Sequence, residues 1–196
     1  MITEFIFFNS AECIEIKQYA YKKEKELEGS KIKEKYNNSI TTNKYDSYNF
    51  FRDHPIYAER LVDLLKKTNA PLEWPIMVQS WVNIYRKGDG IGWHTHQGNG
   101  FSFNIFIDGD ILPGPVYLST GYECGLDKYE MRGVNFENKK GDIQIFPSST
   151  YHKVDPVSSE RISVGATLHN YKDISADALS YLSLTNKDEH GIIILS

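Results

Sequence analysis

Apolar and polar residues alternate with a period of two along much of the chain between residues 76 and 170. This alternation is typical of strands that bury one face, because successive side chains of a strand point to opposite sides. Glycine, proline, asparagine and aspartate separate the alternating runs, as expected of turns. We therefore predict short strands at residues 76–86, 101–107, 114–119, 133–136, 142–146, 152–155 and 161–170.

Two segments ahead of these strands have the period of amphipathic helices. The first covers residues 11–29, with Ser10 as its N-cap and Gly29 at its end. The second covers residues 54–67, where Pro55 suits the first turn. Its apolar residues form one stripe: Tyr57, Leu61, Leu64 and Leu65. A strand at residues 4–8 and a polar loop with a short strand at 30–48 complete this part.

These elements predict a mainly β (α+β) fold, a barrel with N-terminal helices packed on one outer face. We expect a single domain over residues 1–196, with the N-terminal strand and supporting helices at 1–74, the barrel core at 75–170 and a C-terminal extension at 171–196. The extension has a possible helix, 175–184, and ends in the apolar run 191–195. We expect so apolar a terminus to dock on the fold or on another subunit, as in a homo-oligomer.

Composition and charge limit the setting and the partners. The chain has 22 Lys and Arg against 26 Asp and Glu, a net charge of -4, which disfavours a nucleic-acid partner because phosphates need clustered cations. It has no apolar run long enough to span a bilayer and no signal-peptide pattern, so we expect no membrane association and a cytoplasmic location. Cys13 and Cys124 are too few for a disulfide framework, in keeping with a reducing compartment.

Three histidines have the spacing of a metal site. His94 and His96 are two residues apart, so their imidazoles point to the same side of a strand end. His152 follows the alternating run 142–146 and a Pro-Ser-Ser turn that can redirect the chain. Isolated histidines are usually ordinary surface or core residues, but the combined pattern favours a neutral three-imidazole site, which suits Fe(II), Ni(II), Cu(II) or Zn(II).

A candidate anion anchor follows the third histidine. Arg161 and Ser163 share one face of a strand, where the guanidinium can bind a carboxylate as a bidentate fork and the hydroxyl adds a hydrogen bond. A buried cation needs such a partner, because leaving it unpaired costs several kcal/mol. The alternative is a surface ion pair of Arg161 with Glu160 or Asp155. The opposite face of the strand is apolar and should pack against the helices: Ile162, Val164 and Ala166.

Further candidates lie on neighbouring strands. Tyr85 and Asn83 share a face of the strand that enters the histidine motif, and they are either ligand-binding groups or ordinary sheet residues. Ser102 and Asn104 are expected to point inward, where buried polar groups need a partner such as a substrate. Trp93 should point away from the adjacent histidine, as a core residue or as a lid over the substrate.

The order of these motifs, with WVNIYRKGD at residues 81–89 and GDIQIFPS at 141–148, resembles the iron(II)/2-oxoglutarate-dependent dioxygenases. The branch it is most similar to comprises the prolyl-hydroxylase-like enzymes and related phage-type oxygenases. The resemblance covers roughly residues 76 to 170. It implies a double-stranded β-helix, the jelly-roll barrel also seen in cupins.

By this resemblance, the protein is a hydroxylase that uses Fe(II), 2-oxoglutarate and O2. His94, His96 and His152 would hold the iron, although the family usually has an acidic residue at the position of His96. Arg161 and Ser163 would bind the distal carboxylate of 2-oxoglutarate. The family pattern also gives Tyr85 a hydrogen bond to the co-substrate, and Asn83 shares its face. The substrate would be a small molecule or a peptidyl or amino-acid side chain.

Two other functions stay open. A three-histidine cupin-type metalloenzyme would work without 2-oxoglutarate, and a non-catalytic metal-binding or interaction domain would use the Ile-rich tail for assembly. Conversion of 2-oxoglutarate to succinate with Fe(II) separates the dioxygenase from both.

Overall fold

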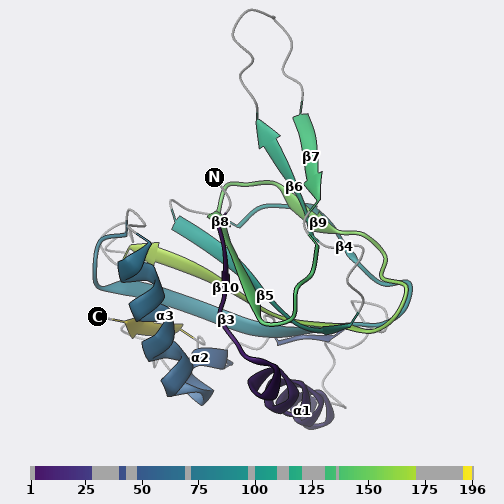
Figure 1. The fold of residues 1–196 in the computed structure, drawn as a ribbon, viewed down its shortest axis with the longest axis horizontal. Helices are drawn as coiled ribbons and strands as arrows, with labels where there is room; N and C mark the ends of the chain where they lie inside the picture. The colour runs from purple at the N-terminus through teal and green to yellow at the C-terminus, as the bar shows by residue number, and fades with distance from the viewer. Residues whose placement is uncertain are drawn as a thin grey trace, which may run out of the picture.

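The larger of two antiparallel sheets forms the lower side of the barrel in Figure 1, next to the helices. The computed structural model describes residues 3–27, 40–42, 48–68, 72–96, 100–109, 115–120, 131–135, 137–170 and 192–195. In spatial order, the sheet contains β1 (Thr3–Ile6), β8 (Asp142–Pro147), β5 (Gly100–Gly109), β10 (Arg161–Asn170), β3 (Ile76–Tyr85) and β11 (Ile192–Leu195). The short β2 (Ile40–Thr41) also pairs with β3.

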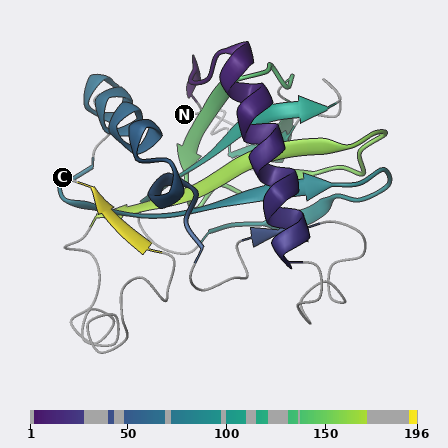
Figure 2. The same ribbon diagram turned by 90° about the horizontal axis from the view of Figure 1, so that it is seen from below.

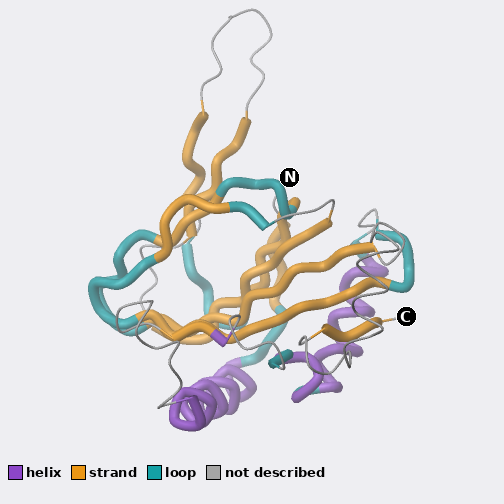
Figure 3. The backbone as a smooth tube through the Cα atoms, turned by 180° about the vertical axis from the view of Figure 1, so that it is seen from behind, coloured by secondary structure: helices purple, strands orange, loops and turns teal. Residues whose placement is uncertain are grey.

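A smaller sheet faces the inner side of the larger one. Its order is β4 (Ile91–His94), β9 (His152–Val154), β6 (Pro115–Thr120) and β7 (Met131–Asn135). The last two form a hairpin that projects beyond the barrel (Figure 1, Figure 3). Two facing antiparallel sheets with this strand order form a double-stranded β-helix, so the predicted fold class is confirmed.

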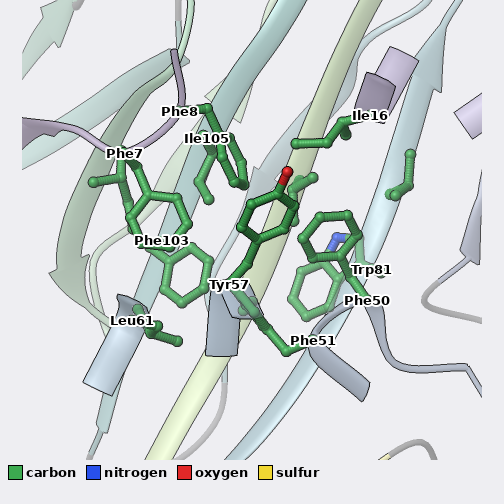
Figure 4. Close-up of a cluster of buried hydrophobic side chains, with 14 of the residues drawn as sticks. Phe7, Phe8, Ile16, Phe50, Phe51, Tyr57, Leu61, Trp81, Phe103 and Ile105 are labelled. Carbon is green, nitrogen blue, oxygen red and sulfur yellow. The ribbon is translucent and has the colours of Figure 1, made fainter. Parts of the chain in front are cut away.

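The described helices cover the outer side of the larger sheet (Figure 2). They are α1 (Ser10–Leu27), α2 (Phe50–Asp53) and α3 (Pro55–Lys67). Between helices and sheet lies a core rich in phenylalanine, in which Phe51 of α2 meets Phe103 of β5 with ring centroids 5.7 Å apart (Figure 4). The outward residues of β10 join this core, as their alternation predicted: Ile162, Val164, Ala166 and Leu168.

Helix boundaries differ from expectation in two places. Asn9, not Ser10, caps α1: its Oδ1 accepts from the Glu12 N–H at 3.0 Å, and the Glu12 carboxylate accepts from the Asn9 N–H at 2.8 Å. This reciprocal capping box satisfies two backbone donors, which explains why it prevails over a serine cap. The second predicted helix is preceded by the short α2. The two helices are separated at His54, because Pro55 disfavours a helical conformation in the residue before it.

The strands agree closely with the alternation, and β10 has the predicted bounds. The apolar tail docks on the fold, since Ile192–Leu195 pairs antiparallel with β3 of the same chain. The predicted helix at 175–184, Gly29 and Cys124 lie outside the described residues. Within the part of the chain that the structure describes, no helix is long and apolar enough to cross a membrane.

Candidate metal centre

Two strands of the smaller sheet bring distant histidines together. β4 and β9 pair antiparallel, with His94 directly opposite His152. His96 lies just past the end of β4, where its backbone N–H donates to the Ser148 carbonyl at 3.0 Å. The ring centroids are 4.1 Å apart for His94 and His152, 5.1 Å for His96 and His152, and 5.4 Å for His94 and His96. The three predicted ligands therefore form one cluster.

Two of the rings are oriented by backbone carbonyls. Nδ1 of His94 lies 2.9 Å from the Gly92 oxygen, and Nδ1 of His152 lies 2.9 Å from the Thr150 oxygen. Because a carbonyl can only accept, each Nδ1 carries the proton and each Nε2 is left with a lone pair for a metal. One ligand atom from each histidine lies within 4.8 Å of the others. Small side-chain shifts suffice for metal–nitrogen bonds of about 2.1 Å, so the residues fit a divalent ion.

Burial keeps two of the three candidate ligands neutral. It lowers the pKa of His96 to about 3, with the neighbouring His152 and His94 adding to the effect. It likewise lowers the pKa of His152 to about 4. Metal ligands must be deprotonated, so these two imidazoles are ready to bind an ion across the neutral pH range.

A second polar feature lies on the inner face of the larger sheet. Arg161 is fully buried at the start of β10, directly opposite Tyr85 on β3. Its guanidinium carbon is 5.7 Å from the centre of the Tyr85 ring and 5.9 Å from that of Phe106. Nε, Nη1 and Nη2 of Arg161 and the Oγ of Ser163 are buried without a hydrogen-bond partner among the described residues.

The alternative surface ion pair for Arg161 does not form. Glu160 instead accepts a hydrogen bond from the Tyr21 hydroxyl and pairs with Arg86 on the outer side of the sheet. A fully buried guanidinium without a partner carries a large desolvation cost, which an anion bound inside the barrel would offset. The barrel thus contains a histidine cluster whose donors suit a cation and a buried guanidinium that suits an anion.

Comparison with known proteins places the fold. No protein-family model and no curated protein sequence matches the chain. Among solved structures, a prolyl hydroxylase from Trichoplax adhaerens, in complex with a hypoxia inducible factor oxygen degradation domain peptide fragment, superposes with a TM-score of 0.63 at 13% identity, covering 88% of this chain and 84% of that one. A Pseudomonas putida prolyl-4-hydroxylase gives 0.58 at 13% identity, covering 86% and 92%. A viral collagen prolyl hydroxylase from Paramecium Bursaria Chlorella virus-1, in complex with 2-oxoglutarate, gives 0.58 at 14% identity, covering 86% and 96%.

The chain has the fold of the 2-oxoglutarate-dependent oxygenases. These similarities in structure come with low sequence identity. They place the barrel and its strand order, whereas the roles of individual residues rest on the geometry of this chain.

The remaining predicted residues lie in different environments. Asn83 is opposite Ser163, on the same inner face as Tyr85. Ser102 is fully buried, and its Oγ lies 2.9 Å from the Oγ of Ser148, so its hydroxyl has a partner within the protein. Asn104 is half-buried opposite Gly165.

Trp93 is a surface residue. It is 44% exposed on β4, and the Lys153 ammonium lies 5.1 Å from its ring centre. The expectation of a core residue is therefore wrong for Trp93, because this edge strand presents its outer face to solvent. Because Trp93 is next to His94 in the sequence, its exposed ring lies at the rim of the histidine cluster.

Three residues near the site were not predicted. Tyr117 of β6 is buried opposite His152, and its hydroxyl donates to the Gln144 side chain at 3.0 Å, joining the two sheets. Trp81 of β3 lies against His96, with ring centroids 5.5 Å apart. His169, at the far end of β10 from Arg161, is half-buried, and burial lowers its pKa. The sequence signal available for Trp81 and His169 was their parity with Tyr85 and Arg161 along their strands.

Proposed function

We propose that this protein is a non-haem Fe(II)- and 2-oxoglutarate-dependent dioxygenase that hydroxylates an amino-acid or peptidyl side chain. The observation that carries the proposal is the presence, inside one barrel, of three convergent imidazoles and a fully buried guanidinium that has no hydrogen-bond partner among the described residues. The first suits a divalent metal, and the second suits a dicarboxylate that reaches from the metal toward Arg161.

Each group has a role that its surroundings support. His94, His96 and His152 would hold Fe(II) on one face, leaving the remaining positions for co-substrate and oxygen. Arg161 and Ser163 would bind the distal carboxylate of 2-oxoglutarate. When bound, Fe(II) and 2-oxoglutarate supply the activation of O2 for hydroxylation of a C–H bond, with succinate and CO2 as the other products.

The protein contributes orientation and a dry environment. The aromatic rings of Tyr85 and Phe106 flank Arg161 and exclude water from its guanidinium. A charge-assisted hydrogen bond in such a low-dielectric pocket is stronger than in water. Burial raises the pKa of the Tyr85 phenol, which therefore stays protonated and can donate to an anion beside Arg161.

The substrate class follows from two weaker indications. The Trichoplax adhaerens enzyme, which shares this fold, is in complex with a peptide fragment. Trp93 and Tyr151 are exposed near His94 and His152, and aromatic rings at a rim suit peptide or side-chain contacts. A cytoplasmic location, the lack of a nucleic-acid partner and self-association through the tail stay predictions from the sequence.

Succinate formation tests the proposed function. Protein loaded anaerobically with Fe(II) and then given 2-oxoglutarate and O2 should release succinate, slowly without substrate and faster with a peptide or amino acid that it hydroxylates. The matched control is Arg161→Leu, which should release none. Metal-loaded protein that neither binds 2-oxoglutarate nor forms succinate would contradict the proposal.

His96 favours one alternative. Three neutral imidazoles, without a carboxylate, are also the ligand set of cupin-type metalloenzymes that bind substrate directly to the metal. In that case metal-dependent oxygen consumption would proceed without 2-oxoglutarate, whereas a non-catalytic metal-binding domain would bind the ion and consume no oxygen.

A further inference from the structure

The imidazole of His96 is held differently from those of the other two histidines. Backbone carbonyls orient His94 and His152 through Nδ1. Among the described residues, no hydrogen bond orients the ring of His96, which lies beyond the end of β4 and is anchored through its backbone N–H. Besides the rings of His94 and His152, the imidazole of His96 contacts the indole of Trp81, which is tilted by 51° to it at a centroid distance of 5.5 Å.

Trp81 is in turn fixed by the strand beside it. Gly165 of β10 lies directly opposite Trp81 in the register of the sheet. A Cβ on Gly165 would lie 2.7 Å from Nε1, 2.8 Å from Cε2 and 3.0 Å from Cζ2 of the indole. Side-chain Cβ atoms do not approach other atoms this closely in proteins. The indole therefore covers a position where only glycine leaves room.

The glycine is needed for space and not for backbone conformation. The described glycines with a left-handed φ are Gly88, Gly109 and Gly141, and Gly165 is not among them. An alanine at 165 therefore adds no backbone strain, and its effect passes through the indole to His96.

We propose that Trp81 and Gly165 are positioning residues that set the imidazole of His96 for metal binding, so that this barrel is built around a histidine at its middle ligand position. The indole performs for His96 the orienting role that carbonyl groups perform for His94 and His152. An aspartate at 96 is shorter and would leave the face of the indole without its neighbour. The inference rests on the proposed metal centre but not on the use of 2-oxoglutarate.

Co(II) is the probe that tests the inference without any turnover. Its ligand-field spectrum reports the geometry of the ligands, and it quenches a nearby indole. In a Trp93→Phe background, which removes the indole next to His94, titration of the apo-protein should quench tryptophan emission with saturation, and most of that quenching should vanish in Trp81→Phe and persist in Trp74→Phe. Zn(II), which has a filled d shell, should compete with Co(II) without quenching.

The variants separate positioning from general damage. Gly165→Ala should shift the Co(II) bands and weaken Co(II) binding by roughly 10- to 100-fold, the range seen when groups that orient metal ligands are removed. In a Trp81→Leu background the same Gly165→Ala change should have little further effect, because the ring atoms that meet the new Cβ are gone. Trp81→Leu, which removes the indole without adding atoms at 165, carries the same expectation if Gly165→Ala does not fold.

Two results would overturn the inference in distinguishable ways. If the parent protein binds Co(II) and both Gly165→Ala and Trp81→Leu keep its affinity and spectrum, the metal centre stands and the positioning role is wrong. If the folded parent protein does not bind Co(II) at all, the metal centre itself fails, and the positioning role fails with it.

Discussion

Arg161 and Tyr85 lie directly opposite each other on neighbouring strands, with the guanidinium carbon 5.7 Å from the centre of the phenol ring. The pair combines a permanent cation with a hydroxyl whose pKa is raised by burial and which therefore stays protonated. Both groups can donate hydrogen bonds, and neither carries a negative charge that could neutralise the guanidinium. Two buried donors on facing strand positions favour an anion. In the proposed function, that anion is the distal carboxylate of 2-oxoglutarate.

Replacing Arg161 with leucine should abolish 2-oxoglutarate binding and leave metal affinity unchanged, because the guanidinium contacts the anion and not the ion. Anaerobic titration, followed by the iron-to-keto-acid charge-transfer band, measures the loss, which we expect to exceed about 100-fold for a desolvated charge pair. Arg86→Leu is the matched control, since Arg86 pairs with Glu24 and Glu160 on the outer side of the sheet. An undiminished band in Arg161→Leu would remove Arg161 from the site.

The same substitution should stabilise the ligand-free protein. The apo-protein bears the desolvation cost of Arg161, and leucine removes it, so the free energy of unfolding should rise by about 1–3 kcal/mol. Urea denaturation of apo-protein and variant measures the difference. A less stable variant would mean that the guanidinium has a structural partner.

The alanine variants of His94, His96 and His152 should each lose most of the bound metal. The protein is expected to bind about one divalent ion per chain, because one ligand atom from each of the three histidines lies within 4.8 Å of the others. His169→Ala is the control, because His169 is not part of the convergent set. Metal analysis after dialysis decides the matter, and full occupancy with unchanged spectra in His96→Ala would place His96 outside the ligand set.

Sequence alternation was sufficient to predict the strand that carries Arg161, β10. The two faces of β10 differ in polarity around Arg161 and Ser163, so its inner face could be predicted, and its bounds agree with the alternation. β3 is different, because nearly all its residues are buried: Trp81 shares the parity of Tyr85, but nothing in the alternation marks its contact with His96. The role of Gly165 depends on its register with Trp81, a long-range pairing that no local pattern encodes.

Local competition explains the remaining differences. Asn9 and Ser10 are both good helix caps, and the partner Glu12 three residues after Asn9 decides between them. Tyr117 lies in a predicted strand, but only the pairing of β6 with β9 places it opposite His152. The positions of the three histidines, Arg161 and Tyr85 could therefore be predicted, whereas those of the supporting aromatic residues Trp81 and Tyr117 could not.

Stability should fall as the pH drops below neutrality, in part through His54. This residue stacks near Tyr19 and Phe50, at ring-centroid distances of 4.4 and 4.6 Å, and burial lowers its pKa. The unfolded chain, whose histidines titrate near pH 6.5, takes up this proton before the folded chain does, so the free energy of unfolding falls from about pH 6.5 down to the lowered folded-state pKa.

His54→Phe keeps the ring contacts and removes the titration. The loss of stability between about pH 7 and pH 5 should therefore be smaller in the variant than in the parent. Urea denaturation of the apo-protein at the two pH values provides the comparison. Equal losses would show that His54 does not contribute.

His96→Asp introduces the acidic ligand that is usual in the family and tests what the neutral set of imidazoles is for. A carboxylate adds one negative charge and is a harder donor than imidazole, so the variant should favour Fe(II) over Cu(II) and Zn(II) and have a lower redox potential. Metal competition and electrochemistry measure both shifts, and Trp81 loses its ring contact in the same change.

If the barrel works as a 2-oxoglutarate dioxygenase, the His96→Asp variant should bind Fe(II) and keep part of its succinate formation. Complete loss of activity with intact Fe(II) and 2-oxoglutarate binding would mean that the chemistry requires a neutral third ligand. Succinate formation that arises only in the variant would show that the parent protein is not an oxygenase, because the carboxylate alone would then complete the catalytic centre.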